Sequence, residues 1–82
     1  MDVKEALELA ESSKITRGKT LMPDAIEYDS YFVFDFRKDP NQKVLDSLVG
    51  VNKKTKKVIA FMPIMVSREE SNNKKKIKVK WS

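Results

Sequence analysis

The chain has 82 residues, a net charge of +5, and neither cysteine nor histidine. This length suits one small domain, and the missing residue types exclude disulfides, cysteine-based metal sites and histidine acid–base catalysis. Hydrophobic residues make up 40% and charged residues 35% of the chain, which predicts a small core beneath a heavily charged exterior.

Residues 2–13 carry the pattern of an amphipathic helix. Asp2 stands at an N-cap position, and Glu5 follows at the spacing of a capping box. Four apolar residues then recur at i, i+3, i+4 and i+7, which places them on one helical stripe: Val3, Ala6, Leu7 and Ala10. Residues 14–24 contain Gly18 and Pro23 and predict a loop, with a short extended piece at residues 20–22.

Residues 26–37 show the strongest periodic signal. The even positions are mostly aromatic or apolar and the odd positions mostly polar, which predicts one strand with a buried face. Phe32, Phe34 and Phe36 are expected at the centre of the core. A break near residues 29–30 is an alternative. The carboxylates of Glu27, Asp29 and Asp35 share the odd face, where a solvated outer surface is favoured over an acid–base or cation site.

Two further strands are predicted at residues 46–52 and 57–62, with Pro63 ending the second or placing it at a sheet edge. Residues 62–66 are apolar at both even and odd positions, which favours core or an inter-subunit strand over a cofactor site. Residues 67–73 are polar and predict a loop. Residues 76–81 alternate again and predict a fourth strand or an ordered tail.

These elements together predict an α+β fold. One N-terminal amphipathic helix packs on a three- to four-stranded antiparallel sheet in a single domain spanning residues 1–82. Residues 67–82 form its lysine-rich C-terminal strand or tail. Most bases lie in the second half: residues 1–36 carry a net charge of −4 and residues 37–82 a net charge of +9.

The predicted hairpin reads Leu48-Val49-Gly50-Val51-Asn52-Lys53-Lys54-Thr55-Lys56-Lys57-Val58. It resembles the hairpin of small PepSY-like and immunity-protein-like helix-plus-sheet modules, with Asn52, Thr55 and Lys56 at the Asp, Thr and Gly positions of their turn motif. The chain is also similar to small uncharacterised phage and prophage proteins in size, lysine content and lack of cysteine and histidine. That resemblance implies a virion component or a host-interaction factor. The simplest turn places Lys56 in the left-handed region.

Two lysine clusters are candidate contact sites for a partner. The residues are Lys53, Lys54, Lys56 and Lys57 at the hairpin, and Lys74, Lys75, Lys76, Lys78 and Lys80 near the C-terminus, beside Trp81. Lysines can neutralise phosphates and an aromatic ring can stack on a base, but lysines also solvate surfaces and protect strand edges. Tyr31 is a further candidate, either as part of a protein interface or as a residue covered by the C-terminal segment.

The leading hypothesis is a non-enzymatic protein-interaction or assembly module, with a protein partner or self-association. A small basic nucleic-acid-binding protein is the alternative. No cofactor, catalytic residue or metal ligand is predicted. The N-terminus does not resemble a signal peptide and no apolar run could span a membrane, so the expected location is the cytoplasm, or a virion for a phage protein.

Overall fold

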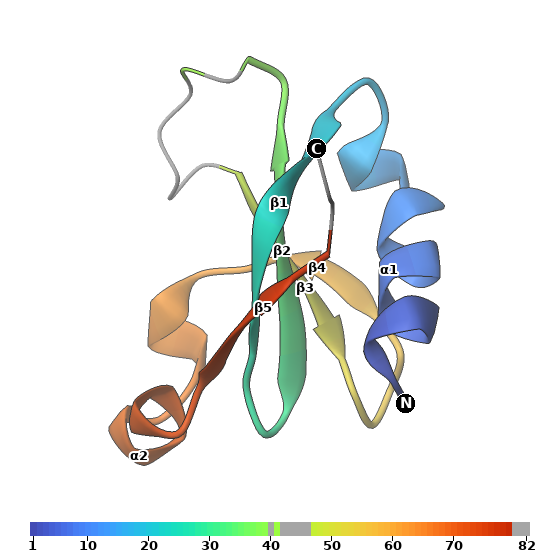
Figure 1. The fold of residues 1–82 in the computed structure, drawn as a ribbon. Helices are drawn as coiled ribbons and strands as arrows, with labels where there is room; N and C mark the ends of the chain where they lie inside the picture. The colour runs from blue at the N-terminus through green and yellow to red at the C-terminus, as the bar shows by residue number, and fades with distance from the viewer. Residues whose placement is uncertain (40, 42–46, 80–82) are drawn as a thin grey trace.

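The structure is a computed structural model that describes residues 1–39, 41 and 47–79. In this part of the chain, helix α1 (Val3–Glu11) lies against one face of a five-stranded antiparallel sheet with the order β4-β3-β2-β1-β5 (Figure 1). The strands are β1 (Thr20–Glu27), β2 (Tyr31–Arg37), β3 (Leu48–Asn52), β4 (Val58–Ala60) and β5 (Lys75–Lys78). The short helices are η1 (Lys14–Thr16), η3 (Pro63–Met65) and α2 (Arg68–Asn72). The predicted α+β fold is confirmed, with more strands than expected.

Helix α1 begins where the sequence predicts, because the Asp2 carboxylate accepts a hydrogen bond from the Glu5 backbone N–H at 2.9 Å. Ala6 and Ala10 face the sheet and are fully buried. Their small side chains let the helix lie close to the aromatic residues of β2. The Glu5 carboxylate, predicted for the other half of a capping box, pairs instead with Lys56 of the β3–β4 hairpin at 3.0 Å.

The core beneath α1 is the one that the alternation of β2 predicts. Phe32, Phe34 and Phe36 project toward the helix, and each is at most 3% exposed. Val49 and Val51 of β3 join them from the neighbouring strand. Because β2 is the central strand of the sheet, its phenylalanines are covered by strands on both sides as well as by the helix.

Of the two alternatives for residues 26–37, the break near residues 29–30 is confirmed and the single continuous strand is wrong. The chain reverses at Asp29 and Ser30, where the Tyr28 N–H donates to the Tyr31 carbonyl at 2.8 Å. Ile26 then pairs with Val33 across the hairpin. Paired residues share a face, so Ile26 and Tyr28 lie on the sheet face opposite to the phenylalanines, contrary to the prediction.

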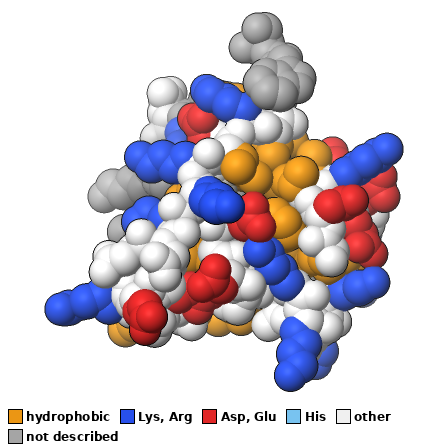
Figure 2. All heavy atoms as spheres, turned by 60° about the horizontal axis from the view of Figure 1, so that its bottom comes forward, with side chains coloured by type: hydrophobic (Ala, Val, Ile, Leu, Met, Phe, Trp, Pro, Cys, Tyr) orange, Lys and Arg blue, Asp and Glu red, His pale blue; other side chains and the backbone are white. Residues whose placement is uncertain are grey.

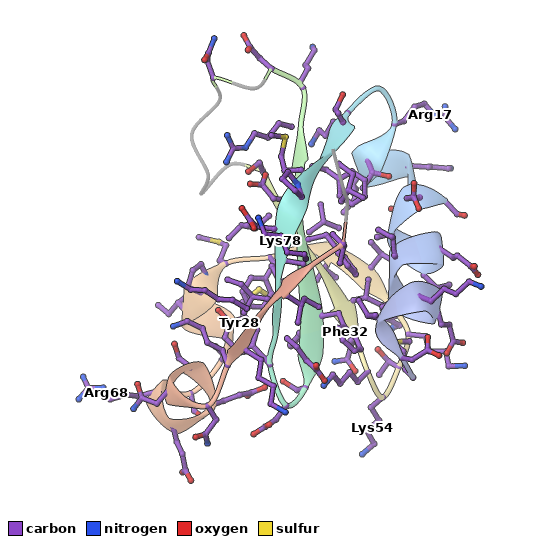
Figure 3. The ribbon with its side chains drawn as sticks, in the orientation of Figure 1. Arg17, Tyr28, Phe32, Lys54, Arg68 and Lys78 are labelled. Atoms are coloured by element: carbon purple, nitrogen blue, oxygen red, sulfur yellow. The ribbon has the colours of Figure 1, made fainter. Side chains whose placement is uncertain are left out.

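The second face is also covered, as one of the two alternatives for Tyr31 predicted, but the cover comes from the segment after β4. Phe61, next after β4, lies over Gly50 and packs with the buried residues Tyr28 and Val33. Its ring stacks on Tyr28 and meets Tyr31 edge to face, with centroids 5.4 Å apart in both pairs. Figure 3 shows Phe32 and Tyr28 on opposite sides of the sheet. The fold therefore has two small cores, one on each face.

The loop predicted for residues 67–73 is wrong, because helix α2 occupies most of it. The Ser67 hydroxyl caps this helix by accepting from the Glu70 N–H at 3.1 Å. The Glu70 carboxylate accepts hydrogen bonds from the Ser30 hydroxyl and, at 2.7 Å, from the Ser30 backbone N–H. It thereby ties α2 to the β1–β2 turn. Burial and then the charge of Glu70 raise the pKa of Tyr28.

The C-terminal alternation forms a strand, one of the two predicted alternatives. Strand β5 pairs with β1 at the sheet edge, with Lys75 opposite Glu27 and Lys78 opposite Asp24. One residue further, the Val79 N–H donates to the Pro23 carbonyl at 2.9 Å. Proline has no N–H to return, which weakens the ladder at this point. Lys80 and Trp81 lie outside the described residues.

The β3–β4 hairpin adopts the predicted turn. The Asn52 side-chain oxygen accepts from the N–H groups of Lys54 and Thr55, at 2.8 and 2.9 Å. Lys56 has a φ of 63°, the one positive φ of a non-glycine residue in the described part of the chain. The prediction of a left-handed Lys56 is confirmed.

Lys56→Gly is expected to leave the free energy of unfolding unchanged or to raise it by up to about 1 kcal/mol, because glycine lacks the Cβ that crowds a left-handed backbone. The substitution removes the ion pair with Glu5, but both side chains are largely exposed and such pairs contribute little. Urea denaturation followed by circular dichroism measures the change. Lys57→Gly, at a position without the positive φ, is the matched control and is expected to destabilise. A clear loss of stability in Lys56→Gly would contradict the backbone strain proposed for Lys56.

Candidate functional site

The hairpin lysines are partly neutralised by the fold. Lys53 Nζ lies 2.7 Å from Glu27 Oε2 and 4.6 Å from the centre of the Phe32 ring. Lys56 pairs with Glu5. Lys54 and Lys57 are exposed, and Lys54 extends from the hairpin tip away from the body of the molecule (Figure 3). Half of this predicted cluster is therefore engaged with acidic side chains that are distant in the sequence.

The C-terminal lysines line the outer margin of the sheet. Lys74, Lys75, Lys76 and Lys78 are all exposed. Lys78 Nζ lies 3.0 Å from Asp24 Oδ1, and its partner is itself largely exposed. Of the predicted site residues in this region, Lys80 and Trp81 fall outside the described part of the chain.

Acidic side chains lie where the two lysine clusters approach each other. Lys53 and Lys75, one from each cluster, border the same small hollow, but the acidic residues Glu27 and Asp29 line it with them. Mixed charges at this point give a surface without a strong potential of one sign.

Tyr31 is half-buried by the side chain of Phe61. The sequence left two alternatives for Tyr31, a protein interface or cover by the C-terminal segment. The structure is closer to the second alternative, but the covering residue belongs to the segment after β4.

The predicted common face of the carboxylates does not exist. Glu27 pairs with Phe32 and lies on the α1 face, whereas Asp35 lies on the opposite face. The Asp35 carboxylate is buried and accepts from Arg37 Nε at 3.1 Å and Nη2 at 2.8 Å. This hydrogen bonding raises the pKa of Arg37. The hairpin at Asp29 is the physical reason for the error, because it separates residues that one straight strand would align.

The largest departure from expectation is an exposed apolar turn, formed by Met62, Ile64 and Met65. These residues are 60%, 87% and 46% exposed, although the sequence favoured core or an inter-subunit strand for this segment. Pro63 opens the 3₁₀ helix η3 and cannot continue the ladder of the edge strand β4. This proline was the available signal that the segment leaves the sheet.

An open pocket of about 550 Å³ lies between the start of α1 and β5. Val3, Phe32 and Ile77 supply its apolar wall, and Asp2, Glu27 and Lys78 also line it. Figure 2 shows hydrophobic side chains left open on this side of the molecule, with lysine and acidic side chains around them. Helix α1 therefore does not cover the outer margin of the sheet.

Comparison with protein-family models, curated proteins and solved structures finds no match to this chain. Within the described residues, no group of three or more acidic side chains could hold a metal ion. None of the described helices is long and apolar enough to cross a membrane.

Proposed function

We propose that the protein is a non-enzymatic interaction module that binds a protein partner through the apolar turn. The exposure of Ile64, at 87%, is the observation that carries this proposal. Three large apolar side chains close together in the sequence cost free energy in water, and burial in an interface would recover it. Methionine side chains are flexible and polarizable, which suits a surface that adapts to a partner.

The non-enzymatic character of the proposal rests on the sequence. Without cysteine and histidine, the chain lacks the commonest nucleophile of high reactivity and the commonest acid–base residue. The part-buried carboxylates of Asp35, Glu27 and Glu70 contact Arg37, Lys53 and Ser30, respectively. Each has a structural partner that accounts for its position.

Ile64→Asp is expected to abolish partner binding while changing the free energy of unfolding by less than about 0.5 kcal/mol, because the side chain makes little contact with its own chain. The measurement is quantitative capture of proteins from the cell that produces this chain, with wild-type and variant protein as bait. Light scattering of both forms at increasing concentration reports self-association.

The matched control is Ile15→Asp, which places the same charge on an exposed isoleucine of η1. It is expected to retain the captured partner. Capture that is equal for the wild type and both variants, together with a monomeric mass for all three, would rule out the apolar turn as the binding surface.

Nucleic-acid binding is the second candidate. The observation in its favour is the run of Lys74, Lys75 and Lys76, which is exposed and forms no ion pair within the described part of the chain. Replacing the three lysines with Gln is expected to weaken binding of DNA or RNA and to reduce the log–log salt slope by up to about 3. A fluorescence titration at several salt concentrations measures both. No binding of the wild type at low salt would eliminate this candidate.

A further inference from the structure

We propose that the outer edge of β5 accepts an extended acidic peptide segment as an additional strand, with an apolar side chain of that segment seated in the pocket beside α1. This surface is separate from the apolar turn. The proposal adds a second binding surface to the interaction module and does not depend on Ile64.

The backbone of β5 offers unpaired hydrogen-bonding groups. Within the described part of the chain, the strand is the last in the sheet and pairs only with β1. The Val79 N–H points to Pro23 of β1, and antiparallel partners alternate between bonded and non-bonded pairs. Ile77 lies two residues before Val79, so its backbone N–H and C=O groups also point toward β1. The N–H and C=O groups of Lys76 and Lys78, at the alternate positions, point outward. An added strand pairs with such outward groups.

The surface on both sides of this edge is hollowed. On the α1 side, Ile77 is half-buried and lines the open pocket of about 550 Å³ with Val3 and Phe32. A second hollow of about 350 Å³ involves Ile26 and Lys76. Side chains of an added strand alternate between the two faces, so a residue on the α1 side would reach the apolar pocket.

The charge of the edge selects an acidic segment. Lys74, Lys75 and Lys76 are exposed beside the outward backbone groups, and within the described part of the chain no carboxylate pairs with them. Glutamate or aspartate side chains of an added strand would lie next to these ammonium groups. Charge complementarity of this kind favours the correct partner and speeds association.

The same surroundings disfavour a nucleic acid at this edge. Asp2 and Glu27 line the apolar pocket, where phosphates would meet like charge. The pocket wall of Val3 and Ile77 suits an aliphatic side chain. An edge strand with lysines that merely prevent aggregation would need no apolar pocket beside it.

The test uses the intact chain and the synthetic peptide Thr-Glu-Val-Glu-Leu-Glu-Thr, labelled with fluorescein. Fluorescence polarization is expected to show binding that is about tenfold or more weaker when the glutamates are replaced by lysines. A peptide with proline in place of valine, which cannot extend the ladder, is expected to bind equally poorly. In two-dimensional NMR, amide shifts are expected at Lys76, Ile77 and Lys78 and at Val3.

Two charge-reversal variants separate a specific edge from general attraction. Lys76→Glu is expected to weaken acidic-peptide binding by about tenfold, and the matched change Lys54→Glu at the distant hairpin by less than about threefold. Equal effects of the two variants, equal affinity for the lysine peptide, or shifts centred on residues 62–65 would overturn the proposal. So would a short DNA or RNA that displaces the peptide and binds more tightly. Because Ile64→Asp leaves this edge intact, loss of peptide binding in that variant would also count against it.

Discussion

Phe34→Ala is expected to lower the free energy of unfolding by about 3–5 kcal/mol, enough to unfold much of a domain of this size. The side chain is fully buried at the centre of β2, between α1 and the neighbouring strands. Truncation to alanine removes its transfer free energy and leaves a cavity that the rigid sheet cannot close. The midpoint of urea unfolding, followed by far-ultraviolet circular dichroism, measures the loss.

Val33→Ala is the control, because it lies next to Phe34 in the chain but faces the other core. The alternation alone predicts that this change costs much less than Phe34→Ala. The structure places Val33 at 1% exposure beneath Phe61, so we expect a cost of about 1–2 kcal/mol for the lost methyl groups. Equal losses for the two variants would contradict the assignment of Phe34 to the main core. No loss for Val33→Ala would contradict the cover by Phe61.

Gly50→Ala is expected to destabilise the fold by about 1–3 kcal/mol, since the added methyl group overlaps a buried ring. A Cβ at Gly50 would lie 2.8 Å from Cδ1 and 3.2 Å from Cβ of Phe61. Phe61 is 2% exposed and held between Tyr28 and Tyr31, so its ring has little room to move. Thermal unfolding and the NMR shifts of Tyr28 and Tyr31 report the energetic and structural change.

Gly18→Ala is the matched control for that substitution. Gly18 has a φ of 74°, but beyond its two chain neighbours no described residue has a heavy atom within 4 Å of a built Cβ, so alanine there meets backbone strain of about 1 kcal/mol and no clash. The Phe61→Leu background gives a second check, because a leucine can turn away from the new methyl group. A cost of Gly50→Ala that is unchanged in this background would show that the ring of Phe61 is not its cause.

Local patterns in the sequence determined helix α1, the phenylalanine face of β2 and the turn at Lys56. In each of these elements, the residues that form the sequence pattern also form the local structure, within a few positions of one another. The carboxylate of Asp2 caps the helix beside it, the phenylalanines repeat with the period of a strand, and Asn52 bonds the backbone of its own turn. No residue distant in the sequence is needed to predict these three features.

Only the tertiary structure decided which face each residue of β1 occupies. The apolar residues Ile26 and Tyr28 continue the alternation of β2 across the reversal at Asp29, so the periodicity does not reveal the hairpin. The register of β1–β2 pairing reveals the hairpin, because Ile26 pairs with Val33 and not with a phenylalanine. Helix α2 was within reach of the sequence, since Ser67 and Glu70 have the spacing of a helix cap, but its docking through Ser30 was not.

The candidate surfaces depended still more on the tertiary structure. The sequence placed lysines in two clusters, but it could not show that Lys53 and Lys56 pair with Glu27 and Glu5, which are 26 and 51 residues away. Hydrophobicity also cannot distinguish a buried apolar segment from an exposed one. Phe61 and Val66 take part in the second core, whereas residues 62–65 between them are exposed, Ile64 to 87%. Exposure there follows from the limited area of a small sheet, which is a property of the packed chain and of no single segment.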